Sequence, residues 1–321
     1  MISNFIKTRG LVIMSIALVT IIAVVVMVVN FSSSKKTNFE LNQQEHQTSN
    51  DGLVTYSSSN VTSGGVTTGK KWSETVGSTT TLIAEPAEGY TFAYWTRTSA
   101  TYKVSALDTV VTESSKASSF TPVFVANSRV KNIATLAEFT SNYNSSSYDI
   151  LRLTANIDAT GISYTPVITF TKVLDGAGYS ILNLNVEIST QTTCGALVQT
   201  LNGGVIKNLT LNACKITDTT SPTATSLGGF AGTIRDGLIS NCVMKSTVNS
   251  GKADCNVGGF VGKATGTSGT ATANIGTSFI DHCVFAGAVL GAKVGALISD
   301  NDAAICDLQN NQSTGSMTKT S

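Results

Sequence analysis

The sequence has little histidine, proline or charge: among 321 residues there are 2 His, 4 Pro and 13% charged side chains. So few charges argue against a coiled coil or a long solvated helix, which needs Glu and Lys in quantity. The net charge of +1 provides no excess of cations to neutralise phosphates, so no nucleic-acid partner is expected. The chain is instead rich in Thr (46), Ser (37) and Gly (28), with 41% hydrophobic residues. This composition favours short strands and turns around a core, and hence an all-β fold.

The N-terminus carries an almost unbroken apolar run over residues 11–29. About 20 residues of helix span a bilayer core, and Lys7 and Arg9 before the run keep the N-terminus cytoplasmic. We therefore expect residues 1–31 to form a cytoplasmic stub and a signal-anchor transmembrane helix in the cell membrane. A cleaved signal peptide, which would make the protein secreted, is the alternative. Residues 32–50 are polar and predict a flexible linker to an extracellular C-terminal region.

Short β-favouring runs alternate with turn residues over residues 51–126. The spacing Gly89-Tyr90-x-Phe92-x-x-Trp95 resembles the small β repeat of Gram-positive surface proteins that is related to the internalin B-repeat. The resemblance implies a spacer or adhesion module without catalysis, whose aromatic residues fill the interior of a small sheet.

Internal repeats occupy residues 130–317. Four similar segments begin at positions 194, 227, 257 and 294, and each is followed by a second apolar strand. The third position of that second strand holds residue types that favour positive φ, namely Asn208, Asn241, His282 and Asp307. The apolar parity shifts by one residue after it, which predicts a structural column of one-residue bends between strands. The repeats therefore predict stacked coils, with His282 as a turn residue because its column neighbours are Asn and Asp.

The best copies of the repeat, Gly-Gly-Phe-Val-Gly at 258–262 and Ile-Asp-His-Cys at 280–283, resemble the GLUG motif of bacterial surface proteins. The resemblance covers residues 130–317 and implies a right-handed parallel β-helix of the pectin-lyase-like type. The first and last copies depart from the motif, with Leu209 and Leu308 in the place of Cys.

An even number of cysteines, six, in an extracellular chain is compatible with disulfides. A solenoid of this size does not need disulfide bonds for stability, however, and Leu replaces Cys in equivalent positions. Both observations favour buried thiols. Cys242 and Cys283 are the candidate disulfide, because they occupy the same position in consecutive coils. No closely spaced Cys or His pairs occur, so no metal site is expected.

Glycoside hydrolysis, a common activity of parallel β-helices, needs two carboxylates across a cleft. The candidates in the solenoid are Asp158, Asp175, Glu187, Asp218, Asp236, Asp281, Asp300, Asp302 and Asp307. Several lie in turn signals, and no zinc-peptidase motif, nucleophile elbow or phosphate loop is present. We therefore expect no catalytic residue and no cofactor.

The combined pattern predicts a non-enzymatic cell-surface protein of a Gram-positive bacterium, either an adhesin or a structural display protein. Host glycans or matrix proteins are the expected partners, contacted through loops at 217–226 and 265–273. One alternative is a carbohydrate-active lyase or glycosidase. Another is a subunit of a larger surface assembly, because an uncovered solenoid end favours self-association.

Overall fold

The computed structural model describes residues 54–97, 102–188, 194–218, 225–266, 277–301 and 306–320. The predicted transmembrane helix at 1–31 and linker at 32–50 lie outside these residues, as does Asp302. Within the described part of the chain, no helix has the length and apolar character needed to cross a bilayer. The described residues fall into two compact units, one with residues 54–56 and 74–77, and the other with residues 57–73 and the described residues from 78 onward. The second unit contains most of the N-terminal β module and all of the coils.

The N-terminal β module, residues 54–126, contains two sheets. The first has the strand order β1 (Val54–Ser63), β2 (Val66–Val76), β3 (Thr79–Pro86) and β6 (Thr109–Glu113). The second has the order β5 (Tyr102–Ser105), β4 (Tyr90–Arg97) and β7 (Phe120–Ala126). A short helix, α2 (Ser114–Ala117), precedes β7, and the turn η1 (Asn127–Arg129) leads into the coils.

Trp95 is the centre of the module core. It is fully buried, and its indole N–H donates a hydrogen bond to the Leu107 carbonyl at 2.8 Å. The Phe92 ring lies 6.0 Å from Trp95 and 6.1 Å from Phe124. A buried indole needs such a hydrogen-bond partner, because an unpaired polar group in the interior is costly.

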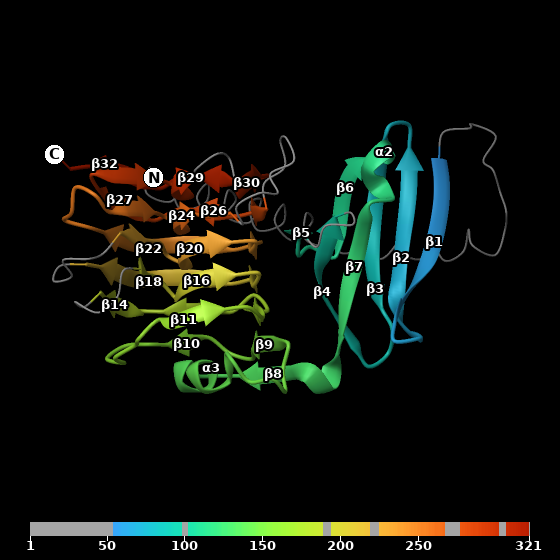
Figure 1. Ribbon diagram of the computed structural model, residues 1–321, viewed down its shortest axis with the longest axis horizontal. Coiled ribbons are helices and arrows are strands. Elements are labelled where there is room, and N and C mark those ends of the chain that lie inside the picture. The colour runs from blue at the N-terminus through green and yellow to red at the C-terminus, as the bar shows by residue number, and fades with distance from the viewer. Residues whose placement is uncertain are drawn as a thin grey trace, which may run out of the picture. The chain divides into compact units, whose positions relative to one another are not determined.

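The coils, residues 130–320, are built from four sheets whose strands pair in parallel (Figure 1). The β8–β30 sheet contains β8 (Val130–Ile133), β9 (Ile150–Leu153), β12 (Val173–Asp175), β17 (Val205–Lys207), β21 (Leu238–Ser240), β25 (Ser278–Asp281) and β30 (Cys306–Gln309). The β11–β29 sheet contains β11 (Val167–Phe170), β16 (Val198–Asn202), β20 (Ala231–Arg235), β24 (Val261–Ala264) and β29 (Ile298–Asn301).

The other two sheets complete each coil. The β10–β32 sheet contains β10 (Ile157–Asp158), β13 (Ser180–Leu182), β14 (Asn185–Glu187), β18 (Thr210–Thr217), β22 (Val243–Asn249), β26 (Val284–Phe285), β27 (Ala288–Gly291), β31 (Gln312–Ser313) and β32 (Ser316–Lys319). The β15–β28 sheet contains β15 (Cys194–Gly195), β19 (Ser226–Leu227), β23 (Asn256–Gly258) and β28 (Lys293–Gly295). The coils that begin at β12, β17, β21 and β25 contribute a strand or strand pair to all four sheets, and the other coils contribute to some of them. This arrangement fits a parallel β-helix.

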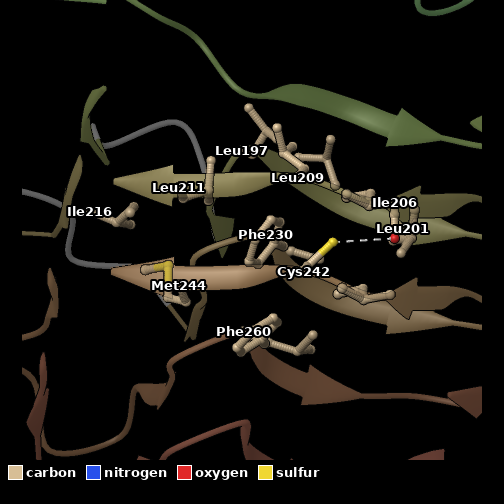
Figure 2. Packing of buried hydrophobic residues seen from close by; sticks show 14 of the residues in the cluster. Leu197, Leu201, Ile206, Leu209, Leu211, Ile216, Phe230, Cys242, Met244 and Phe260 are labelled. Carbon is tan, nitrogen blue, oxygen red and sulfur yellow. Dashed lines mark hydrogen bonds between the residues drawn. The ribbon is translucent and has the colours of Figure 1, made fainter. Parts of the chain in front are cut away.

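The strand register stacks like residues on one another inside the coils. Ile206 lies opposite Ile239, which lies opposite Ile280 in the next coil. The rings of Phe230 and Phe260 stack at 4.9 Å with an angle of 21°. Figure 2 shows Ile206, Phe230 and Phe260 pointing into one interior from successive coils. Apolar columns of this kind remove side chains from water along the whole stack, at about 25 cal/mol per Å² of apolar surface.

The Gly-Gly pairs of the repeats are explained by close backbone contact. A Cβ atom on Gly259 would lie 2.0 Å from the Ala296 carbonyl oxygen. On Gly229 it would lie 2.5 Å from the Met244 side chain and 2.6 Å from the Gly259 oxygen. Only glycine fits where neighbouring coils approach this closely.

The N-terminal end of the coils is covered by the helix α3 (Leu136–Asn142). Thr135 and Glu138 form a capping box, in which each side chain accepts from the other residue's backbone N–H. Leu136 and Phe139 are buried, and the Phe139 ring lies 5.8 Å from Phe170 in the first coils. The helix thus closes the interior at this end.

Candidate functional site

Most strands of the β8–β30 sheet are followed by a one-residue bend at positive φ. Asn208, Asn241 and His282 have φ angles of 54°, 52° and 51°. Each comes directly after a strand of this sheet, and a strand of the β10–β32 sheet begins two residues later. Asn is among the residues that adopt this conformation most readily, because its short polar side chain bonds locally.

Asp307, the fourth predicted member of this column, lies elsewhere. It is inside β30, opposite Phe279, whereas Asn310 follows the strand with a φ of 54°. The sequence alignment of the last coil was therefore shifted by three residues. The apolar pair at 305–306 resembles the start of the second strand in the earlier copies, so the sequence alone places position 305 opposite Ile280. In the structure, Ile280 is opposite Leu308. Leu308 accordingly does not take the Cys position of the repeat.

Side chains along the bends are joined in a hydrogen-bonded ladder. The Asn241 amide donates to the Asn208 side-chain oxygen at 2.8 Å, and the Asn208 amide donates to Asp175 at 3.0 Å. Farther along, the Asn310 amide donates to Asp281 at 3.3 Å, and His282 Nδ1 lies 2.6 Å from the same carboxylate oxygen. The ladder satisfies these polar groups within the stack, and His282 takes part as a turn residue.

The residues just before the bends form a second polar column on the outer face of the β8–β30 sheet, which is buried at Asp175, Lys207, Ser240 and Asp281. Strand register places them side by side in the order Arg152, Asp175, Lys207, Ser240, Asp281 and Gln309. Arg152 Nε lies 3.2 Å from Asp175, and Lys207 Nζ lies 4.0 Å from the same carboxylate. Burial of charge is tolerated here because opposite charges are neighbours and are hydrogen-bonded.

This polar column binds the β module. Lys207 Nζ donates to the carbonyl oxygens of Phe92 and Ala93 at 2.9 and 3.0 Å, and it lies 5.3 Å from the centre of the Phe92 ring. The Ser105 hydroxyl bonds Asp281 at 2.7 Å, and the Ala106 N–H donates to Ser240 at 3.1 Å. Burial lowers the pKa of Lys207, while the nearby Asp175 carboxylate opposes that shift.

An apolar column lies beside the polar one and packs into the same core as Trp95. Its members are buried residues on the outer face of the sheet: Ile150, Val173, Val205, Leu238 and Phe279. The outer face of this sheet is therefore apolar at these positions and not exposed to solvent. Consecutive apolar residues such as Val205-Ile206 were the available signal, because strands buried on both faces read as continuous apolar runs.

A groove of about 580 Å³ opens where the end of this column meets the β module. Its charged lining comprises Arg97, Glu113, Lys116, Asp281 and His282. Amides and hydroxyls line it further, from Gln309, Asn310, Ser78, Thr79, Ser105, Thr109 and Thr112, and the apolar side chains of Val104, Val110, Val111 and Phe120 complete the lining. The groove thus presents hydrogen-bond donors and acceptors beside apolar surface.

The candidate carboxylates have structural contacts. Asp158 accepts from the Thr160 N–H and from the Asn183 amide, each at 3.0 Å. Buried Asp218 accepts from the Ser250 hydroxyl at 2.5 Å. Asp300 pairs with Lys263 at 3.1 Å.

The remaining candidates lie in turns or strands. Asp236, with a φ of 51°, occupies a turn. Glu187 lies at the exposed end of β14. In the groove, Asp281 is 2% exposed and its two oxygens contact Ser105, Ser240, His282 and Asn310.

Cys242 and Cys283 are adjacent buried thiols in one interior column. The Cys242 sulfur lies 3.6 Å from the carbonyl oxygen of Ile206 in the preceding coil (Figure 2). The Cys283 sulfur lies 3.6 Å from the carbonyl oxygen of Ile239. All six cysteines are free thiols in the structure, so the predicted bridge between these two stays a prediction. Burial, together with the contact to Cys242, raises the pKa of the Cys283 thiol well above its ordinary value. Such a thiol is a poor nucleophile at neutral pH.

Within the described residues, no group of three or more His, Cys, Asp or Glu side chains is placed to hold a metal ion. The predicted contact loops at 217–226 and 265–273 lie largely outside those residues.

No protein-family model and no curated protein matches this chain. Among solved structures, "a putative immunoglobulin A1 protease from Bacteroides ovatus" is similar with 13% sequence identity and a TM-score of 0.36. The alignment covers 59% of this chain and 82% of that chain. Similarity at this level carries no information about activity.

Proposed function

We propose that the chain is a non-enzymatic cell-surface adhesin that binds carbohydrate in the groove between the β module and the coils. Its β-helix is assigned to the right-handed GLUG type and its module to the B-repeat-like type of Gram-positive surface proteins. Residues 1–31 would anchor it in the membrane, with the remainder outside the cell.

The observation that carries this proposal is the groove lining. Sugar hydroxyls donate and accept hydrogen bonds, and the groove offers cations and amides beside carboxylates and hydroxyls. One wall of the groove belongs to the β module and the other to the coils. Buried contacts of Lys207 and Asp281 join the two, so the walls are held in place before a ligand binds. Pre-formed sites of this kind reduce the ordering cost of binding.

The acids of the groove favour binding over catalysis. Asp281 is engaged by four hydrogen-bonding neighbours, and Glu113 pairs with Lys116 at 2.9 Å. A general acid or base must give up and regain a proton at a reacting atom, and a carboxylate fixed in such contacts is poorly suited to that.

The test is to apply the full-length chain to arrays of host glycans and matrix proteins. Arg97→Ala and Gln309→Ala, in the groove, should weaken binding at least about tenfold, equivalent to about 1.4 kcal/mol. Lys245→Ala, at the exposed position of β22 and outside the groove, is the control and should bind as wild type does.

Absence of binding to every arrayed glycan and matrix protein would refute the adhesin proposal. Turnover of pectins or host glycans that is lost in an Asp→Asn variant would instead establish the carbohydrate-active enzyme.

A further inference from the structure

The module wall of the groove contains the edge of a sheet. β6 pairs with β3 on one side, and among the described residues no strand pairs with its other side. At one end of this ladder the Ser114 N–H bonds the Ser78 carbonyl at 2.8 Å. At the other end the Ala84 N–H bonds the Asp108 carbonyl at 2.8 Å. Because hydrogen-bonded pairs alternate along an antiparallel ladder, these two bonds fix which residues of β6 face β3.

Thr109 and Val111 direct their backbone groups away from β3. Both lie between the hydrogen-bonded pairs of the ladder, so their N–H and C=O groups point to the open side. Both also line the groove, where Val111 is 68% exposed. Among the described residues, no hydrogen bond engages these backbone groups. The groove thus contains amide donors and acceptors that a ligand can use.

The coil wall of the groove presents amides of a second kind. The side chains of Gln309 and Asn310 line it, and each amide can donate and accept. Gln309 is exposed, and within the described part of the chain its side chain has no hydrogen-bond partner. Asn310 donates from its amide nitrogen to Asp281 at 3.3 Å, which leaves its side-chain oxygen available.

The remaining lining restricts the ligand further. The module contributes apolar side chains, from Val104, Val110, Val111 and Phe120. Apart from His282, the charged side chains are two cations and two carboxylates, from Arg97, Lys116, Glu113 and Asp281. Opposite charges in equal number favour a ligand without net charge.

An uncharged secondary amide with a methyl group matches this lining. Its N–H and C=O point in opposite directions from a planar trans unit, so one can bond β6 while the other faces the amides of the coil wall. Its methyl group can contact the apolar side chains and leave water. The acetamido group of an N-acetylated amino sugar is such an amide.

We propose that the groove binds N-acetylated amino sugars, whose acetamido group is recognised by the open backbone groups of Thr109 and Val111. The inference rests on the proposed carbohydrate binding in this groove and adds the class of sugar. A sugar with a hydroxyl in this position cannot bond both walls and brings no methyl group. A site built to hydrogen-bond one group discriminates strongly against an analogue that lacks it.

Matched pairs of sugars test the proposal by isothermal titration of the full-length chain in detergent. Chitotriose carries an acetamido group on each ring where cellotriose carries a hydroxyl, and N-acetylgalactosamine differs from galactose in the same way. The N-acetylated member of at least one pair should bind at least about tenfold more tightly than its partner. Equal affinity within both pairs, or binding confined to other ligands, overturns the inference and leaves the adhesin proposal standing. Failure to bind any glycan or matrix protein overturns both.

A backbone variant tests the edge of β6. Val111→Pro removes one open N–H without removing a bond to β3, and proline is tolerated in edge strands. It should weaken binding of the N-acetylated sugar about fivefold, as expected for one hydrogen bond. Val111→Ile keeps the N–H and the apolar side chain and should bind as wild type does. A folded Val111→Pro with wild-type affinity contradicts the proposal.

Saturation-transfer NMR of the wild type with the N-acetylated sugar needs no variant. The acetamido methyl protons should receive more saturation from the protein than the ring protons, because the methyl group lies against Val111 and its apolar neighbours. Stronger saturation of the ring protons overturns the proposed recognition.

Discussion

The outer faces of two sheets in the same stack have opposite characters. In the β8–β30 sheet, outer residues such as Val205 and Leu238 are fully buried under the β module. In the β10–β32 sheet, Lys215 and Lys245 occupy outer positions and are exposed. The backbone pairing is parallel in both sheets, so the difference lies in the side chains and in what covers them. A parallel sheet needs cover on both faces only where its outer side is apolar.

The largest expected effect comes from removing a large outer-face side chain under the module. Phe279→Ala should lower the free energy of unfolding by about 3–5 kcal/mol, because it leaves a cavity where a fully buried ring was. Ile168→Ala, also on an outer face but 66% exposed, should change it by less than about 0.5 kcal/mol. Chemical denaturation measures both. Equal losses in the two variants would show that the module does not cover this sheet.

The next effect concerns the buried cation of the same face. Lys207→Met keeps an apolar stem but leaves the Phe92 and Ala93 carbonyls without this donor, at a cost of about 2–3 kcal/mol. Lys215→Met, on the exposed face, should be close to neutral. Denaturant titration of the two variants beside wild type checks the contrast. A neutral Lys207→Met would mean that the polar column contributes nothing to docking.

The same lysine predicts a pH dependence. Burial lowers the pKa of Lys207 in the folded protein, whereas the unfolded chain keeps about 10.4. Between these two values the unfolded chain binds a proton that the folded protein has released, so the free energy of unfolding rises with pH. The stability difference between wild type and Lys207→Met should therefore grow as pH increases toward about 10.4. A difference that is flat with pH, as expected for Lys215→Met, would contradict the assignment.

The smallest effect is expected at the bends between the two sheets. Asn241→Ala forces a residue with a Cβ and no local hydrogen bond into a φ of 52°, at a cost of about 1–2 kcal/mol. It also removes the 2.8 Å bond to Asn208. His282→Asn should stay within about 0.5 kcal/mol of wild type by thermal unfolding, because Asn tolerates this backbone. A large loss of stability in His282→Asn would show that the imidazole contributes more than tolerance of the positive φ at the bend.

Much of the coil region could be predicted because its signals are local. The bend at Asn208 follows from a side chain that favours positive φ and from the parity shift after it. The bend of the last coil was predicted at Asp307, because Cys306-Asp307 resembles the strand residues before the bend in earlier copies. The bend is at Asn310, three residues farther along the chain. A terminal repeat has one neighbour, so weaker packing constraints leave it a less regular sequence.

The groove and the buried polar column could not be predicted, because they depend on residues that are far apart in the chain. Ser105 and Asp281 are separated by 176 positions and share a 2.7 Å hydrogen bond. No periodicity connects them. Asp281 is a catalytic candidate from its chemistry alone, and its hydrogen bond to Ser105 exists only where the module meets the coils.

The sequence by itself determined the short strands, the bends and the stacking of like residues, since these rest on side-chain alternation and on the φ preferences of single residues. The tertiary structure decided which outer face is covered and which charges are buried. These features arise when separate segments meet and exclude water from one another, and the free energy of that burial belongs to the pair of surfaces.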